Sequence, residues 1–199
     1  MKISISQYYK GFKSFYGLIT GIPLVVPGLR LCVPDSSALA GYLFPPLGDA
    51  QHLLLTLTVA ILLVLTYVVF VCCRGVRKVP RKAFLALLGG MVLGPGALIP
   101  LYASFVRRVE IPSVNEEAFV TIGYQQTDFA VQTYPQGKWT DWDMLQDRGP
   151  WEAQIQKLWT RRSISIVRVS LWVSYLMTLA CLISIGSLAV YQHVLEKTA

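Results

Sequence analysis

One uninterrupted apolar run sets the strongest limit on what this chain can fold into. From His52 to Cys73 the sequence contains no Asp, Glu, Lys or Arg, and leucine and valine dominate it. The run has about the length, roughly 20 residues, that crosses ~30 Å of hydrocarbon. Because backbone groups inside a bilayer must satisfy their own hydrogen bonds, the run is predicted to be a transmembrane helix.

Three further segments extend this membrane pattern. Ala83 to Val106 and Val169 to about Tyr191 also lack charged residues, and each is predicted to be a span. Ser14 to Val33 is long enough as well, but it contains prolines, interior glycines and Arg30. We expect this segment to form a kinked or broken first span, with a re-entrant or interfacial segment as the alternative. Only 15% of the chain is charged, against about 25% in soluble domains.

The predicted fold class is therefore an all-α integral membrane protein with a four-span helical bundle. Spans 1 to 3 and their short loops occupy residues 1–106. A small extracytoplasmic insert occupies residues 107–163, and residues 164–199 hold the last span and a short tail. The apolar stretch from Ala38 to Leu47 is too short to cross, and we expect it to lie on the membrane surface as a loop.

Two structural elements are predicted inside the insert. Ala118 to Gln125 and Phe129 to Tyr134 are rich in β-forming residues and are separated by Gln126-Thr127-Asp128, which predicts a β-hairpin. A helix is predicted from Pro150, because proline suits the first helical turn. Apolar residues recur on one face of this amphipathic helix, which should lead into the last span: Trp151, Ile155, Leu158 and Trp159.

A cluster of basic residues orients the bundle. The loop between the spans that begin at His52 and Ala83 is short and strongly basic. Short basic loops remain cytoplasmic, so we expect both termini in the cytoplasm and the insert outside, as in a bacterial inner membrane. The same side chains either serve only to fix this orientation or also dock anionic lipid headgroups or a cytoplasmic protein effector. They are Arg74, Arg77, Lys78, Arg81 and Lys82.

Small and hydroxyl-bearing residues mark the helix faces that should pack. Ala86, Gly90 and Gly94 stand four residues apart and share one face, where close helix approach drives association in lipid. The contact lies either within the chain or between protomers, and we predict a homo-oligomer. The last span carries a second stripe that either packs against a helix or lines a pore: Ser170, Ser174, Thr178, Cys181, Ser184 and Ser187.

Tryptophans gather in the insert, at positions 139, 142, 151 and 159. Tryptophan favours the headgroup layer of a membrane and is also common at protein interfaces. We interpret Trp139, Trp142, Trp151 and Trp159 as membrane-interface anchors, with a protein-binding surface as the alternative. Arg30 is the intramembrane charge of the first segment, and it either snorkels to the interface or pairs with an acid.

Catalysis finds little support in the sequence. The chain has 2 histidines, predicted on opposite sides of the membrane, and it contains no HExxH, GxSxG or phosphate-binding loop. Its 4 cysteines include no CxxC pair. Asp141 and Asp143 do not share a helical face and are interpreted as solvated turn acids. We predict no enzyme activity, no catalytic residues, no cofactor, no metal site and no direct contact with nucleic acid.

Two functions of different class remain. In the first, the chain is an oligomeric sensor or scaffold that couples its outer segment to a cytoplasmic partner. In the second, it is an oligomeric channel that depolarises the membrane. The size, the number of spans and the insert between the last two resemble KwaA, the membrane subunit of Kiwa antiphage defence systems. This resemblance implies a tetrameric inner-membrane sensor that works with a DNA-binding cytoplasmic effector, although small conjugation or immunity proteins share the same plan.

Overall fold

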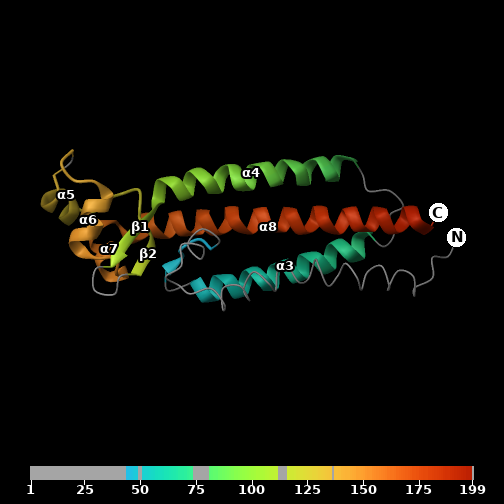
Figure 1. The fold of residues 1–199 in the computed structure, drawn as a ribbon, viewed down its shortest axis with the longest axis horizontal. Helices are drawn as coiled ribbons and strands as arrows, with labels where there is room; N and C mark the ends of the chain where they lie inside the picture. The colour runs from blue at the N-terminus through green and yellow to red at the C-terminus, as the bar shows by residue number, and fades with distance from the viewer. Residues whose placement is uncertain (1–43, 49–50, 74–80, 112–115, 136, 199) are drawn as a thin grey trace. The chain divides into compact units, whose positions relative to one another are not determined.

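The chain is mostly helical, with one small sheet (Figure 1). The computed structural model describes residues 44–48, 51–73, 81–111, 116–135 and 137–198. The elements in chain order are α3 (Gln51–Cys73), α4 (Arg81–Phe105), β1 (Val106–Ile111), β2 (Glu116–Thr121), α5 (Asp128–Thr133), α6 (Asp141–Arg148), α7 (Glu152–Leu158) and α8 (Arg161–Thr198).

Two described helical stretches are long and apolar enough to cross a membrane: Leu85–Phe105 in α4 and Arg161–Ile185 in α8. Little of the most apolar part of either stretch is buried inside the structure, 6% in the first and 28% in the second. The helix predicted from His52 is confirmed as α3, and its stretch Gln51–Leu65 forms a shorter apolar helix. The predicted first span, Ser14 to Val33, lies outside the described residues.

The ends of the helices differ from the prediction. α4 already begins at Arg81, so Arg81 and Lys82 form its first turn instead of belonging to the loop. Its last residue is Phe105, because Val106 starts a strand. α8 begins at Arg161, well before the predicted start at Val169, since helical backbone continues through polar residues that were assigned to the insert.

The described residues divide into two compact units. The helical unit comprises described residues 55–73, 81–95 and 176–198. There, Leu62 of α3 and Ile183 of α8 form a buried apolar pair to which Leu176, Leu179 and Ala180 of α8 add contacts. α8 also packs against α4 in this unit, because the positions of Gly90 and Gly94 lie directly against α8 side chains.

The sheet unit comprises the remaining described residues, 44–48, 51–54, 96–111, 116–135 and 137–175. β1 and β2 pair antiparallel, with Val106 opposite Thr121 and Ile111 opposite Glu116. α6 packs against β1, and both α5 and α6 contact α7 (Figure 1). One buried cluster joins the sheet to these helices and to the start of α8, and consists of Val109, Val120, Ile122, Ala130, Tyr134, Met144, Leu145, Ile155, Leu158, Trp159 and Ile164.

The predicted hairpin was wrong in its choice of strands. Residues from Ala118 to Thr121 are indeed extended, but they pair with β1, which precedes them. The segment from Phe129 to Tyr134 belongs largely to helix α5 instead of a strand. The cause is local, because the Thr127 side chain accepts a hydrogen bond from the Ala130 N–H at 3.2 Å and so caps the start of a helix.

The helix predicted from Pro150 is confirmed as α7, but it is short and separate from the last span. Trp151 is its N-cap residue, and the helix closes at Leu158 before α8 starts. The segment from Phe44 to Leu47 also departs from the prediction of a loop on the membrane surface. Phe44 and Leu47 are 2% and 1% exposed and thus buried within the protein, and the Thr121 hydroxyl donates to the Pro46 carbonyl.

Candidate ligand-binding site

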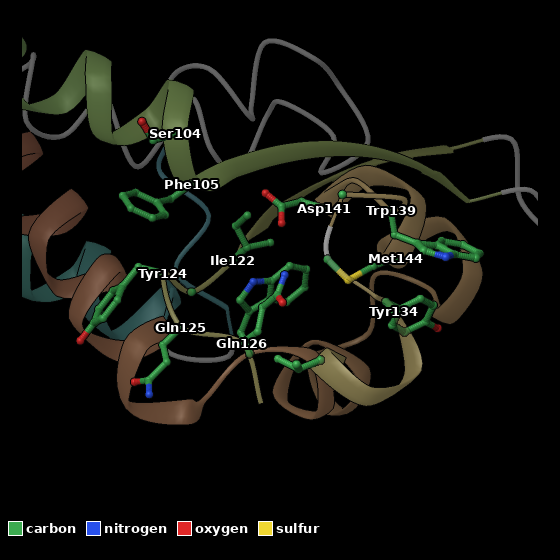
Figure 2. Close-up of a pocket in the computed structure, with 14 residues that line it drawn as sticks. Ser104, Phe105, Ile122, Tyr124, Gln125, Gln126, Tyr134, Trp139, Asp141 and Met144 are labelled. Atoms are coloured by element: carbon green, nitrogen blue, oxygen red, sulfur yellow. The ribbon is translucent and has the colours of Figure 1, made fainter. Parts of the chain in front are cut away.

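A cavity of about 650 Å³ opens in the sheet unit (Figure 2). Its volume falls in the range of small-molecule sites, about 300–1,000 Å³. The wall is built from the end of α4, the loop after β2, α5, the start of α6 and the residue that follows α7. The lining residues are Ser104, Phe105, Ile122, Gly123, Tyr124, Gln125, Gln126, Val131, Tyr134, Gly137, Trp139, Asp141, Met144 and Trp159.

The loop after β2 is held in place by the segment between α7 and α8. The Thr160 N–H donates to the Gln125 carbonyl at 2.9 Å, and Gln126 forms an isolated antiparallel bridge with Trp159. This short stretch of pairing fixes one side of the cavity, because the loop cannot shift without breaking backbone hydrogen bonds.

Gly123 marks the closest approach of this loop to α8. A Cβ atom there would collide with the Ser163 side chain and would lie 3.0 Å from the Trp159 Cβ and 3.2 Å from the Ile164 nitrogen. Two of these three neighbours are a packed side-chain root and a backbone atom, which cannot move away cheaply. Only glycine therefore lets the loop sit this close to the start of α8.

The opposite part of the wall is set by the N-terminus of α6. Thr140 caps this helix, since its hydroxyl accepts from the Asp143 N–H at 3.2 Å while the Asp143 carboxylate accepts from the Thr140 N–H at 2.8 Å. This reciprocal pair is a capping box. Hydrogen bonds from the Thr140 side chain and backbone also lower the pKa of Asp143. The cap fixes Asp141 and Trp139 on either side of Thr140, and both line the cavity.

Asp141 carries the charge of the cavity wall. Arg107 Nη2 lies 3.3 Å from Asp141 Oδ2, and the two side chains are 28% and 32% exposed. The Arg107 guanidinium is shared, because its Nη1 donates to the Ala103 carbonyl at 2.9 Å. The ion pair joins β1 to α6, and the described contact uses one carboxylate oxygen.

Tyr134 is fixed by polar groups behind the wall. Its hydroxyl donates to the Asp147 carboxylate and accepts from Arg148 Nε, which lies 2.8 Å away. Burial and the bond to Asp147 raise the pKa of Tyr134. The Arg148 guanidinium also lies 5.2 Å from the centre of the Phe129 ring. The Tyr134 ring meets Trp139 edge-on, with 5.0 Å between their centres, so two aromatic side chains of the lining support each other.

A partly buried ion pair joins α7 to α8 in the same unit. Arg168 Nη1 and Nη2 donate to the two Glu152 carboxylate oxygens at 2.9 and 2.6 Å. These bonds lower the pKa of Glu152, against the opposing effect of burial. A Cβ atom at Gly48 would lie 2.7 Å from Arg168 Cζ, so the guanidinium also packs directly on that backbone. The bidentate geometry is the strong form of this pair.

The four tryptophans predicted as anchors fall into different environments. Trp139 lines the cavity and is 43% exposed. Trp142 and Trp151 are also exposed, so their role as membrane anchors stays a prediction. Trp159 is 1% exposed, which corrects the prediction for this residue. It shares its helical face with Ile155, and that face forms the core of the sheet unit.

The small-residue face of α4 is covered by α8 of the same chain. A Cβ atom at Gly90 would lie 2.6 Å from Cys181 Sγ, and one at Gly94 would lie 2.5 Å from Thr178 Oγ1. The two glycines therefore contribute to helix packing within one chain. Ala86 is exposed.

Arg30, Arg74, Arg77 and Lys78 lie outside the described residues. The described part of the chain contains no group of three or more His, Cys, Asp or Glu side chains that could hold a metal ion. Comparison of the chain with protein-family models, with curated proteins and with solved structures finds no match.

Sequence reasoning missed the cavity and most of its wall. Asp141 was interpreted as a solvated acid, although Thr140 and Asp143 have the spacing of a capping box, which signals a helix that starts at Asp141. Arg107 is the first residue of the predicted insert. No local signal identifies its partner, because the two residues are far apart in sequence and meet only through the pairing of β1 with α6.

Proposed function

We propose that the chain is a non-enzymatic, membrane-anchored sensor subunit whose sheet unit binds a small molecule. The observation that carries this proposal is the position of the cavity wall along the chain. Phe105 is the last residue of α4, and Trp159 lies just before α8. In the described part of the chain, these two helices contain the stretches with the length and composition of membrane spans. A ligand that contacts both Phe105 and Trp159 would therefore lie against the end of α4 and next to the start of α8.

Packing around Phe105 supports this coupling. Phe105 contacts the main core cluster and also a second cluster formed by Val106, Val167 and Leu171. Its carbonyl accepts from the Ile122 N–H at 2.9 Å, which ties the end of α4 to the cavity loop. A change of packing in the cavity would therefore reach α4 and α8 through contiguous contacts.

The signal is proposed to pass to a cytoplasmic protein effector through the basic stretch between α3 and α4. In this proposal the chain is a homo-oligomer in a bacterial inner membrane, with both termini in the cytoplasm and a role in antiphage defence as the KwaA resemblance implies. Lys78→Gln combined with Lys82→Gln keeps three arginines for orientation, but it should weaken recovery of the effector from membranes, most clearly at low salt, where the removed charges are least screened. Equal recovery at low and moderate salt would limit the stretch to fixing topology.

A depolarising channel is the alternative function, and the packing of the α8 stripe argues against it. Ser174 and Cys181 are 7% and 9% exposed. The Ser184 hydroxyl donates to the Ala180 carbonyl of its own helix at 2.7 Å. Thr178 lies against Gly94. Side chains that are buried or bonded in this way would have to leave these contacts to line a pore.

Two variants in α5 test the cavity as a ligand site. Val131 lines the cavity, whereas the neighbouring Gln132 is exposed and lies outside the lining. The purified full chain in detergent is incubated with a small-molecule extract of the host cell and measured by native mass spectrometry. Val131→Trp should fill the cavity and abolish the bound mass, and Gln132→Trp should keep it.

The same preparation decides between sensor and channel. Liposomes that contain the unmodified chain should hold an ion gradient as long as empty liposomes do. Rapid collapse of the gradient would favour the channel. Equal retention of the bound molecule by Val131→Trp and by the unmodified chain would refute the cavity as its site.

A further inference from the structure

We infer that the cavity selects an organic ammonium ion with a flat apolar body, such as an aralkyl amine. This inference deepens the proposed function and rests on the cavity being the ligand site. It is carried by the charge of the lining, by the acceptor capacity of Asp141 and by the aromatic side chains around it.

The charge of the described lining disfavours anions. Among the described residues that line the cavity there is one carboxylate, Asp141, and no lysine, arginine or histidine. A carboxylate or phosphate ligand would face the Asp141 carboxylate, and two like charges so close together repel each other. A cationic ligand would instead be attracted by the Asp141 carboxylate.

Asp141 retains capacity to accept such a partner. A carboxylate offers about four lone-pair sites, and the described contact with Arg107 uses one oxygen at 3.3 Å. That distance is longer than the roughly 2.7–2.9 Å of a strong charge-assisted hydrogen bond. Figure 2 shows the Asp141 carboxylate among the lining side chains, turned toward Phe105 and Ile122. An ammonium group beside Asp141 would form a hydrogen bond to the carboxylate that is shorter than the contact from Arg107.

The rest of the wall fits the body of an aralkyl amine. Aromatic rings attract cations through their faces and pack against flat ligands through dispersion. Apolar side chains complete the surface, and the lining holds two amides but no further charge. The aromatic and apolar lining residues are Phe105, Ile122, Tyr124, Val131, Tyr134, Trp139, Met144 and Trp159.

The test compares three probes of nearly equal shape: 2-phenylethylamine, 2-phenylethanol and phenylacetate. Isothermal titration of the full chain in a non-ionic detergent, with empty micelles as reference, should show binding of the amine. The alcohol should bind about tenfold to a hundredfold more weakly, since it lacks the charge-assisted bond. Phenylacetate should not bind. Equal binding of the alcohol or the acid, or failure of the amine to bind, would overturn the proposed ligand class.

Two variants of the ion pair should change amine affinity in opposite directions. Asp141→Asn should weaken amine binding to the level of the alcohol. Arg107→Gln should strengthen it, because the competing cation is removed. A purely structural role for the pair would weaken binding in both variants, which would contradict the inference. Asp128→Asn is the matched control, since Asp128 is exposed and lies outside the lining, and it should bind the amine as the unmodified chain does.

The cavity-filling variant Val131→Trp distinguishes an error in the ligand class from an error in the proposed site. If the alcohol or the acid binds and Val131→Trp abolishes that binding, the cavity is a ligand site but the ligand class is wrong. If the amine binds equally well to Val131→Trp, the amine lies elsewhere, and both the inference and the proposed site fail.

Discussion

Gly94→Ala should separate two helices that otherwise touch. The added Cβ would lie 2.5 Å from Thr178 Oγ1, 3.1 Å from the Thr178 nitrogen and 3.2 Å from its Cα. Rotation of the Thr178 side chain can relieve the first contact but not the other two, because they involve backbone. α4 and α8 must therefore move apart by some tenths of an ångström, and packing is lost along the whole contact.

The effect of Gly94→Ala on the free energy of unfolding is best judged against Gly89→Ala, a variant in the same helix. No atom lies within 4 Å of a Cβ at Gly89, so this change gains helix propensity, about 0.8–1 kcal/mol relative to glycine, at no cost in packing. Gly94→Ala gains the same propensity but overpacks the contact, which costs about 1–3 kcal/mol. The difference between the two variants is therefore about 1–3 kcal/mol, and helix propensity cancels from it.

Gly90→Ala tests whether a contact with one side-chain atom costs less stability than a contact with backbone. Its Cβ would meet only Cys181 Sγ, at 2.6 Å. The effect should be smaller than that of Gly94→Ala, and Cys181→Ala should reverse it by removing the obstructing atom.

The assay is unfolding of the detergent-solubilised chain by sodium dodecyl sulfate, followed by circular dichroism. Native gels should show the same assembly size for all these variants, because α8 of the same chain already covers this face of α4. Equal unfolding free energies for Gly94→Ala and Gly89→Ala would refute the packing argument. Loss of assembly without loss of stability would restore the face as a contact between protomers.

Three further predictions concern the sheet unit. Hydrogen bonds from Arg168 lower the Glu152 pKa, so the stabilisation that they give is complete above the ordinary glutamate pKa of ~4.3 and is lost as the pH falls below it. Glu152→Gln should lower the free energy of unfolding by about 1–3 kcal/mol near neutral pH and remove this part of its pH dependence. An unchanged pH profile of stability would contradict this prediction. Thr140→Ala should cost about 1 kcal/mol through loss of the α6 cap, measured by denaturation, and a neutral effect would show that the cap is dispensable. In a cysteine-free background, cysteine at Gln146 should react with an impermeant maleimide on intact spheroplasts and cysteine at Gly75 should not; the reverse pattern would invert the topology.

The helices were predictable because length and composition alone define them. α3 and α4 follow from stretches without charge, and the Ile155 and Leu158 spacing predicted α7. The ends of the helices were not predictable in the same way. α8 continues through Arg161 and Arg162 because a helix can carry exposed charges in its first turn, and hydropathy does not register such residues.

The errors in the insert share a physical cause. The segment from Phe129 to Tyr134 has β-forming residues, but the Thr127 cap and the packing of Ala130 and Tyr134 into the core favour a helix. Strand propensity is a weak preference that such contacts override. Trp159 illustrates the same point, since the spacing that predicted its helical face also places that face in a core, away from lipid.

The sheet unit is assembled from segments that leave the ribosome at very different times. Phe44 and Leu47 are synthesised long before the strands, yet they are buried, and the Pro46 carbonyl between them accepts a hydrogen bond from Thr121 of β2. Ile164, Val167 and Leu171 come last and complete the clusters that contain the strand residues. Because chains emerge at about 5–20 residues per second, the early segment waits several seconds for its partners. A chain that stalls before α8 lacks Ile164, Val167 and Leu171, so the two clusters of this unit stay incomplete until the last helix is made.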